Sequence, residues 1–189
     1  MNKLLLLVIF LTTVASGAFA QTNATPPAKP VYPPTVPSTQ LSIGGEFGFP
    51  AGAASSVYGS VLGASVKLEV PVSKSAFNVI VSAGYSFFLT KFNYPGIYKS
   101  ALYVPIEVGG KYYFSKIGFV EGDLGLSENV NGNYPGEKTA FVYAPAIGFS
   151  APTSKHKAAI DVSLRYEDRV GSGGAISQIA LRLAYRFHI

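Results

Sequence analysis

The sequence predicts an all-β protein, an eight-stranded antiparallel up-and-down transmembrane β-barrel. Apolar residues recur at every second position in eight blocks that begin near residue 40, and a period of two indicates strands. The mean hydropathy of +0.29 is high, yet no segment after residue 20 is long enough for a membrane-spanning helix. The charged residues of the blocks gather on the face opposite the apolar one, which is typical of a barrel with lipid outside.

Residues 1–20 are expected to be a cleaved signal peptide. Lys3 supplies a positive start, residues 4–11 form an unbroken apolar stretch, and residues 18–20 (Ala-Phe-Ala) form a small-x-small cleavage site. The apolar stretch is shorter than a membrane helix requires. We therefore expect export, with cleavage before Gln21.

Residues 21–39 are expected to be a periplasmic linker, because they hold six of the 13 prolines. Such a segment cannot pack a core, and it favours an extended polyproline II arm. A spacer is the simpler interpretation, and a docking segment for a periplasmic partner is the alternative.

The barrel itself is expected over residues 40–189. The eight blocks lie at residues 41–49, 62–70, 77–87, 102–112, 120–126, 141–150, 160–167 and 178–189. In the seventh, for example, Ile160 and Val162 alternate with Asp161 and Ser163. The sequence does not assign the phase of the sixth block. Because a proline removes a ladder donor, we expect a β-bulge at Pro105 and another at Pro145.

The placement of the charged residues bears on which face of each strand meets lipid or water and which face lines the interior. In a soluble sandwich or a lipocalin-like barrel they would face water, whereas in a membrane barrel they fill the interior and pair there. The membrane version predicts a structural network of interior charges, made of Glu46, Lys67, Glu69, Glu107, Lys111, Glu121, Asp123, Asp161, Arg165, Glu167, Arg182 and Arg186.

Loop lengths and aromatic residues favour the membrane version. Short connections near residues 71–75, 115–116 and 151–155 alternate with mostly longer ones near residues 50–57, 90–100 and 127–138, as in outer-membrane barrels with short periplasmic turns. The connection near residues 170–175 is a short exception. Aromatic residues near the strand ends are typical of the two interfacial girdles: Phe47, Phe49, Tyr85, Phe87, Tyr112, Phe114, Phe149, Tyr166, Tyr185 and Phe187.

Two segments resemble the small bacterial outer-membrane β-barrel proteins, including the OmpX/OmpA-type barrels and the outer-membrane protein β-barrel domain family. They are residues 103–114 (YVPIEVGGKYYF) and residues 181–187 (LRLAYRF), and the likeness extends over residues 40–189. The resemblance implies a terminal strand that the outer-membrane assembly machinery reads during insertion. The chain departs from that pattern by ending in His188 and Ile189.

The sequence offers little chemistry beyond this. Eight strands enclose an interior that side chains fill, so an open pore is not expected. A switchable gate, formed by Glu107 with Lys111 or by Glu121 and Asp123 with Arg182 and Arg186, is the sharper alternative to a structural network. The only histidines are His156 and His188, and neither has an obvious triad partner. We expect no catalytic, metal or cofactor-binding residues.

These observations predict a non-enzymatic integral protein of the bacterial outer membrane, with a structural, adhesive or envelope-maintenance role. Its expected partners are outer-membrane lipids, the assembly machinery and a periplasmic partner of the Pro-rich arm. It is expected to be a monomer and to bind no nucleic acid. The alternatives are a soluble secreted barrel that binds a small apolar ligand, and a lipid-modifying barrel enzyme.

Overall fold

The computed structural model describes residues 38–73, 75–91, 99–131, 138–153, 158–172 and 174–189. They form eight strands and one short 3-10 helix, η1 (Gly52–Ser56). The strands are β1 (Gln40–Ala51), β2 (Tyr58–Pro71), β3 (Phe77–Thr90), β4 (Ala101–Tyr113), β5 (Gly118–Asn129), β6 (Thr139–Thr153), β7 (Ala158–Gly171) and β8 (Gly174–His188). No helix among the described residues is long and apolar enough to cross a membrane.

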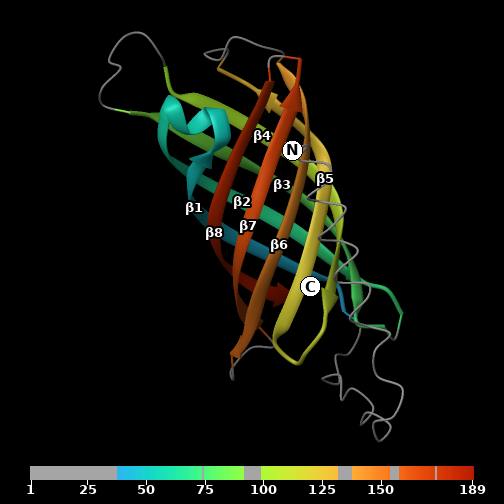
Figure 1. Ribbon diagram of the computed structural model, residues 1–189. Coiled ribbons are helices and arrows are strands. Elements are labelled where there is room, and N and C mark those ends of the chain that lie inside the picture. Colours follow the sequence, from blue (N-terminus) through green and yellow to red (C-terminus); the bar gives the residue numbers. More distant parts are fainter. Residues whose placement is uncertain (1–37, 74, 92–98, 132–137, 154–157, 173) are drawn as a thin grey trace, which may run out of the picture. The chain divides into compact units, whose positions relative to one another are not determined.

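The strands close into a barrel in which each pairs with its neighbour in the sequence, and β8 pairs with β1 (Figure 1). The closing ladder is antiparallel and runs without a shift from Gln40 opposite His188 to Ala51 opposite Ser177. Closure leaves no sheet edge, so the strands can satisfy their backbone groups in one another. The predicted eight-stranded up-and-down barrel is confirmed.

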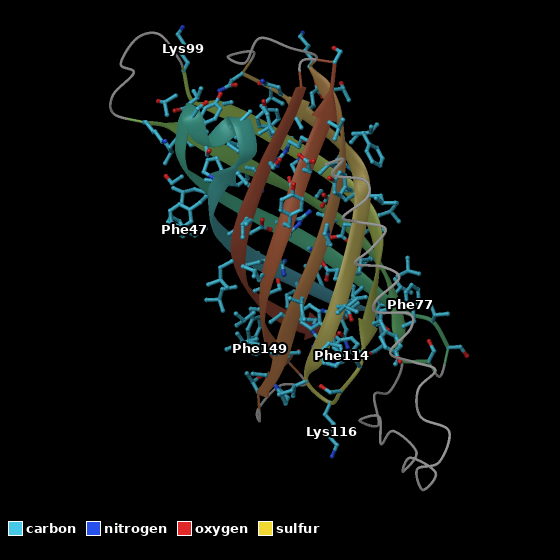
Figure 2. All side chains as sticks on the ribbon, in the orientation of Figure 1. Phe47, Phe77, Lys99, Phe114, Lys116 and Phe149 are labelled. Carbon is cyan, nitrogen blue, oxygen red and sulfur yellow. The ribbon has the colours of Figure 1, made fainter. Side chains whose placement is uncertain are left out.

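The two faces of each strand separate as the alternation predicts, and Phe47, for example, lies on the outside (Figure 2). Ile43, Val108, Leu124, Leu164 and Leu183 are examples of large apolar side chains that lie exposed on the outside. The charged residues of the strands are mostly buried inside. This arrangement is inside out relative to a soluble protein, and it contradicts the alternative of a soluble barrel with an apolar interior.

The predicted β-bulges at Pro105 and Pro145 are wrong. Pro105 pairs in register with Ser127 of β5, and Pro145 pairs in register with Gly122 of the same strand. On the other side of each proline the ladder skips two residue pairs and then resumes in the same register. A proline lacks one donor, and that donor serves only one neighbouring strand, so no extra residue has to be inserted.

The sixth block, whose phase the sequence left open, follows the ordinary alternation. Phe141, Ile147 and Phe149 lie exposed on the outside, and Val142 and Ala144 are buried inside. The one register shift that the ladders contain lies between Tyr58 and Ser60, where β2 meets β3.

The connections divide the barrel into two ends. We call the end with the short connections after Pro71, Tyr113 and Thr153 the turn end, and the end with η1 and the connections after Thr90 and Asn129 the loop end. The segment near residues 50–57, expected to be a plain loop, contains η1. The predicted signal peptide (1–20) and all but the last two residues of the predicted linker (21–39) lie outside the described residues.

A substitution at Gly125 of β5 tests the close approach of the β4 and β5 backbones. A Cβ there would lie 2.0 Å from the carbonyl oxygen of Ile106, whereas a Cβ at Gly122 of the same strand would meet nothing within 4 Å. Gly125→Ala is therefore expected to prevent closure and to abolish the compact, fast-migrating band of a folded barrel on an unboiled gel. Gly122→Ala should keep that band, and equal behaviour of the two variants would contradict the β4–β5 register.

Candidate functional site

The barrel interior holds most of the buried polar side chains of the described chain, and it receives all twelve residues that the sequence singled out. All twelve form ion pairs with one another, with N–O distances of 4.0 Å or less. Their side chains are at most 12% exposed, so the pairs are shielded from water. Burial makes each pair depend on its partner, because an unpaired charge in such a place is costly.

The group nearest the turn end joins four strands. Lys111 of β4 donates to Glu69 of β2 and to Asp161 of β7, at 3.1 Å each. Arg186 of β8 donates to Asp161 at 3.3 Å, and Tyr113 donates to Glu69 at 3.1 Å. The ammonium of Lys111 also lies 4.0 Å from the centre of the Phe119 ring, a cation–π contact.

Next to this group, Lys67 of β2 reaches across the barrel to β5. It pairs there with Glu121 and, at 2.9 Å, with Asp123. One ammonium thus serves two carboxylates. The second oxygen of Asp123 is buried and accepts no hydrogen bond from the described residues.

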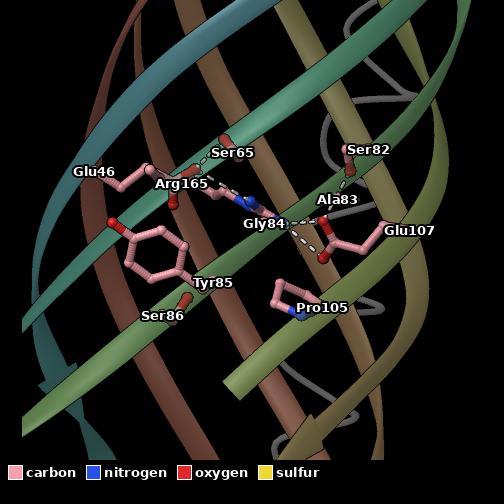
Figure 3. A pocket seen from close by; sticks show the side chains of 11 residues that line it. Glu46, Ser65, Ser82, Ala83, Gly84, Tyr85, Ser86, Pro105, Glu107 and Arg165 are labelled. Atoms are coloured by element: carbon pink, nitrogen blue, oxygen red, sulfur yellow. Dashed lines mark hydrogen bonds and ion pairs between the residues drawn. The ribbon is translucent and has the colours of Figure 1, made fainter. Parts of the chain in front are cut away.

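Arg165 of β7 lies inside the barrel between Glu46 and Glu107 (Figure 3). Its guanidinium donates to Glu107 of β4 at 2.6 Å and lies 3.3 Å from Glu167 and 3.7 Å from Glu46 of β1. A small cavity beside Glu107 and Arg165 has room for roughly one water molecule. No passage of solute size follows from it.

Arg169 and a cluster of aromatic and aliphatic side chains fill the interior towards the loop end. Arg169 is 1% exposed, pairs with Glu167, and lies 5.3 and 5.1 Å from the rings of Phe88 and Tyr103. Beyond it, we call the following buried residues the apolar plug: Ala54, Tyr58, Val61, Phe88, Ala101, Tyr103 and Ile176. The plug brings η1 into contact with the barrel interior at the loop end.

The ion pairs expected for the two possible gates are wrong. Glu107 pairs with Arg165 rather than with Lys111, and Glu121 and Asp123 pair with Lys67 rather than with Arg182 or Arg186. Residues four apart on a strand are separated by about 13 Å, which is too far for an ion pair. Strands that face each other across the barrel bring the charges together instead.

The apolar plug was not foreseen, although a signal for it exists. Tyr58, Phe88 and Tyr103 are aromatic residues at inward positions near the same end of the barrel. The burial of Asp168 and Ser177 was not foreseen either, because both lie on the outward face of their strands.

The histidines contribute differently. His188 lies at the end of β8, where its Nδ1 is 2.5 Å from the hydroxyl of Ser38, a contact that joins the two ends of the barrel segment. The sequence alone did not indicate Ser38 as a partner of His188. His156 lies outside the described residues. Within the described part of the chain, no three His, Cys, Asp or Glu side chains are grouped to hold a metal ion.

Comparison with known proteins identifies the architecture. No family model matches the chain, and neither does any curated protein. The crystal structure of Ail, the attachment invasion locus protein of Yersinia pestis, is similar with a TM-score of 0.52 and 17% identity, over 79% of this chain and 98% of Ail. The chain has the fold of the small outer-membrane β-barrels.

Two further structures extend the comparison. Ail in a phospholipid bilayer nanodisc gives the same TM-score of 0.52 at 17% identity, over 79% of this chain and 99% of Ail. The N-terminal barrel domain of Pseudomonas aeruginosa OprF gives 0.45 at 11% identity, over 80% of this chain and 98% of that domain. At 17% identity the similarity to Ail concerns the fold alone.

The Lys67 pair tests the interior network. Lys67→Met leaves Glu121 and Asp123 buried without their base, which should lower the free energy of unfolding by about 3 to 5 kcal/mol. The measurement is a urea titration of the barrel in lipid vesicles, followed by the compact band on an unboiled gel. The matched control is Lys99→Met, because Lys99 is exposed at the loop end and should change stability by less than about 0.5 kcal/mol. A Lys67→Met barrel as stable as the control would contradict the network.

Proposed function

We propose that the protein is a sealed, non-enzymatic barrel of the bacterial outer membrane, which serves as a structural or adhesive anchor rather than as a channel. The observation that carries this proposal is the filled interior. Ion pairs occupy the barrel from the turn end to Arg169, and the apolar plug follows at the loop end. Solutes therefore have no path, and function is left to the two ends and to the outer wall.

Export and anchoring follow from the same proposal. The signal peptide at residues 1–20 would direct the chain out of the cytoplasm, and the linker at residues 21–39 would extend from the turn end into the periplasm towards a partner there. The outer-membrane assembly machinery and the surrounding lipids are the other partners that we propose. Ail is named for attachment and invasion, and its similar fold supports considering adhesion for the loop end of this chain.

The sealed interior is tested by conductance. The refolded, purified protein is expected to give no stepwise current in planar lipid bilayers, while the same sample shows a compact band on an unboiled gel. Regular, reproducible conductance steps would overturn the anchor proposal. A compact band that is lost on boiling, together with recovery in the outer-membrane fraction, would support the membrane location separately.

The enzymatic alternative has its own test, because Ser38 and His188 are in contact. Incubation of the folded barrel with labelled phospholipid and lipopolysaccharide is expected to leave both unchanged. Release or transfer of an acyl chain by the native protein but not by His188→Ala would overturn the non-enzymatic proposal. The loss of activity in that variant would trace the reaction to this pair.

A further inference from the structure

Asp168 is an unusual acid, because it points to the outer wall of the barrel and is nevertheless buried. On β7 the inward residues are Arg165, Glu167 and Arg169, so Asp168 shares the outward face with Leu164 and Val170. Those two neighbours are 51% and 45% exposed, whereas Asp168 is only 8% exposed. Something covers this carboxylate on the lipid side.

Two hydroxyl groups from the neighbouring strands hold the carboxylate. Tyr143 of β6 lies directly opposite Asp168 and donates to its Oδ2 at 2.8 Å. Ser177 of β8 lies opposite on the other side and donates to its Oδ1 at 2.7 Å. The three side chains form one row across β6, β7 and β8, which lie side by side in Figure 1, and we call them the Asp168 row.

The row lacks a positive charge. The other buried acids of the strands, from Glu46 to Glu167, each have a Lys or Arg within 4.0 Å. Asp168 has none among the described residues, and its partners there are neutral hydroxyls. A buried carboxylate without a counter-charge is costly, so an external cation would stabilise it.

The position of the row indicates where that cation would come from. Asp168 lies three residues before Gly171, the last residue of β7. This spacing places Asp168 about 10 Å along the strand from the loop end. Tyr143 lies directly opposite Asp168, and the ring of Tyr166 is 6.4 Å from the ring of Tyr143. Such tyrosines mark the depth at which the lipid headgroups begin.

We propose that the Asp168 row binds a divalent cation that is shared with the phosphate of a neighbouring lipid in the outer leaflet. Carboxylate and hydroxyl oxygens are hard ligands, which suit Mg²⁺ or Ca²⁺. One protein carboxylate is too little to hold such an ion alone, and Mg²⁺ is commonly bound by one or two carboxylates together with phosphates and retained water. Because the row lies on the outward face of the barrel near its loop end, the phosphate is a headgroup phosphate. The inference rests on the proposed outer-membrane placement.

The test measures stability against urea with the full mature chain folded into vesicles, with and without Mg²⁺ and with NaCl of equal ionic strength as the screening control. One set of vesicles contains lipopolysaccharide, and the other contains phosphatidylcholine alone. At a Mg²⁺ concentration ten times Kd, the unfolding equilibrium constant of the native protein should fall about tenfold in the lipopolysaccharide vesicles. In Asp168→Asn this decrease should be absent.

Glu128→Gln is the matched control, because Glu128 is an exposed acid near the loop end of β5 and its replacement removes the same charge. It should retain the full effect of Mg²⁺. Ser177→Ala, which keeps the carboxylate, should weaken the effect, and it serves as the second variant if Asp168→Asn does not fold.

Three results would overturn the proposal. The first is no effect of Mg²⁺ on the native protein, and the second is an equal effect in Asp168→Asn. The third is an Asp168→Asn barrel that is more stable than the native one without Mg²⁺ and insensitive to it, which would mean that Asp168 is a neutral carboxylic acid. Phosphatidylcholine carries its phosphate only in a zwitterionic headgroup, so an equal Mg²⁺ effect in those vesicles would overturn the assignment to the anionic phosphate of the outer leaflet. Failure to fold into any vesicle would instead count against the proposed membrane placement.

Discussion

The ladder between β1 and β8 is the constraint on which the rest of this structure depends. A lipid bilayer offers no hydrogen bonds to the backbone, so a sheet can cross it only when its first and last strands pair. Here they do so over the whole of β1, from Gln40 to Ala51. Once the sheet is closed, one face of each strand is committed to lipid and the other to a narrow interior. The chemistry of the chain follows from that division.

A narrow interior has to be filled, and this chain fills it in two ways. Ion pairs such as Lys67 with Asp123 and Arg165 with Glu107 bridge strands that are distant in the sequence, and they hold the middle of the barrel from several sides. At the loop end, the apolar side chains of Phe88 and Tyr103 fill the interior, and Arg169 lies between them and the ion pairs. In the part of the chain that the structure describes, side chains thus pack the barrel interior from the turn end to the loop end.

The same closure explains why the chain tolerates features that would disrupt an open sheet. Pro105 and Pro145 each lose one donor, but both keep their pairing with β5, and the register on the other side is preserved by the strands around it. The outer wall also holds the polar row of Tyr143, Asp168 and Ser177, because three neighbouring strands supply its mutual hydrogen bonds. A single strand could not keep such a group at the edge of a membrane.

The sequence by itself determined the number of strands, their approximate bounds and the face on which each charge lies, because alternation with a period of two is a local property of the chain. That is why Glu107 and Lys111 were placed inside correctly. Only the tertiary structure decided their partners, since the tilt and stagger of the strands set which residues meet across the barrel. For the same reason the apolar plug, the contact of Ser38 with His188 and the buried Asp168 emerged only from the closed barrel. Each depends on residues brought together by closure rather than by sequence spacing.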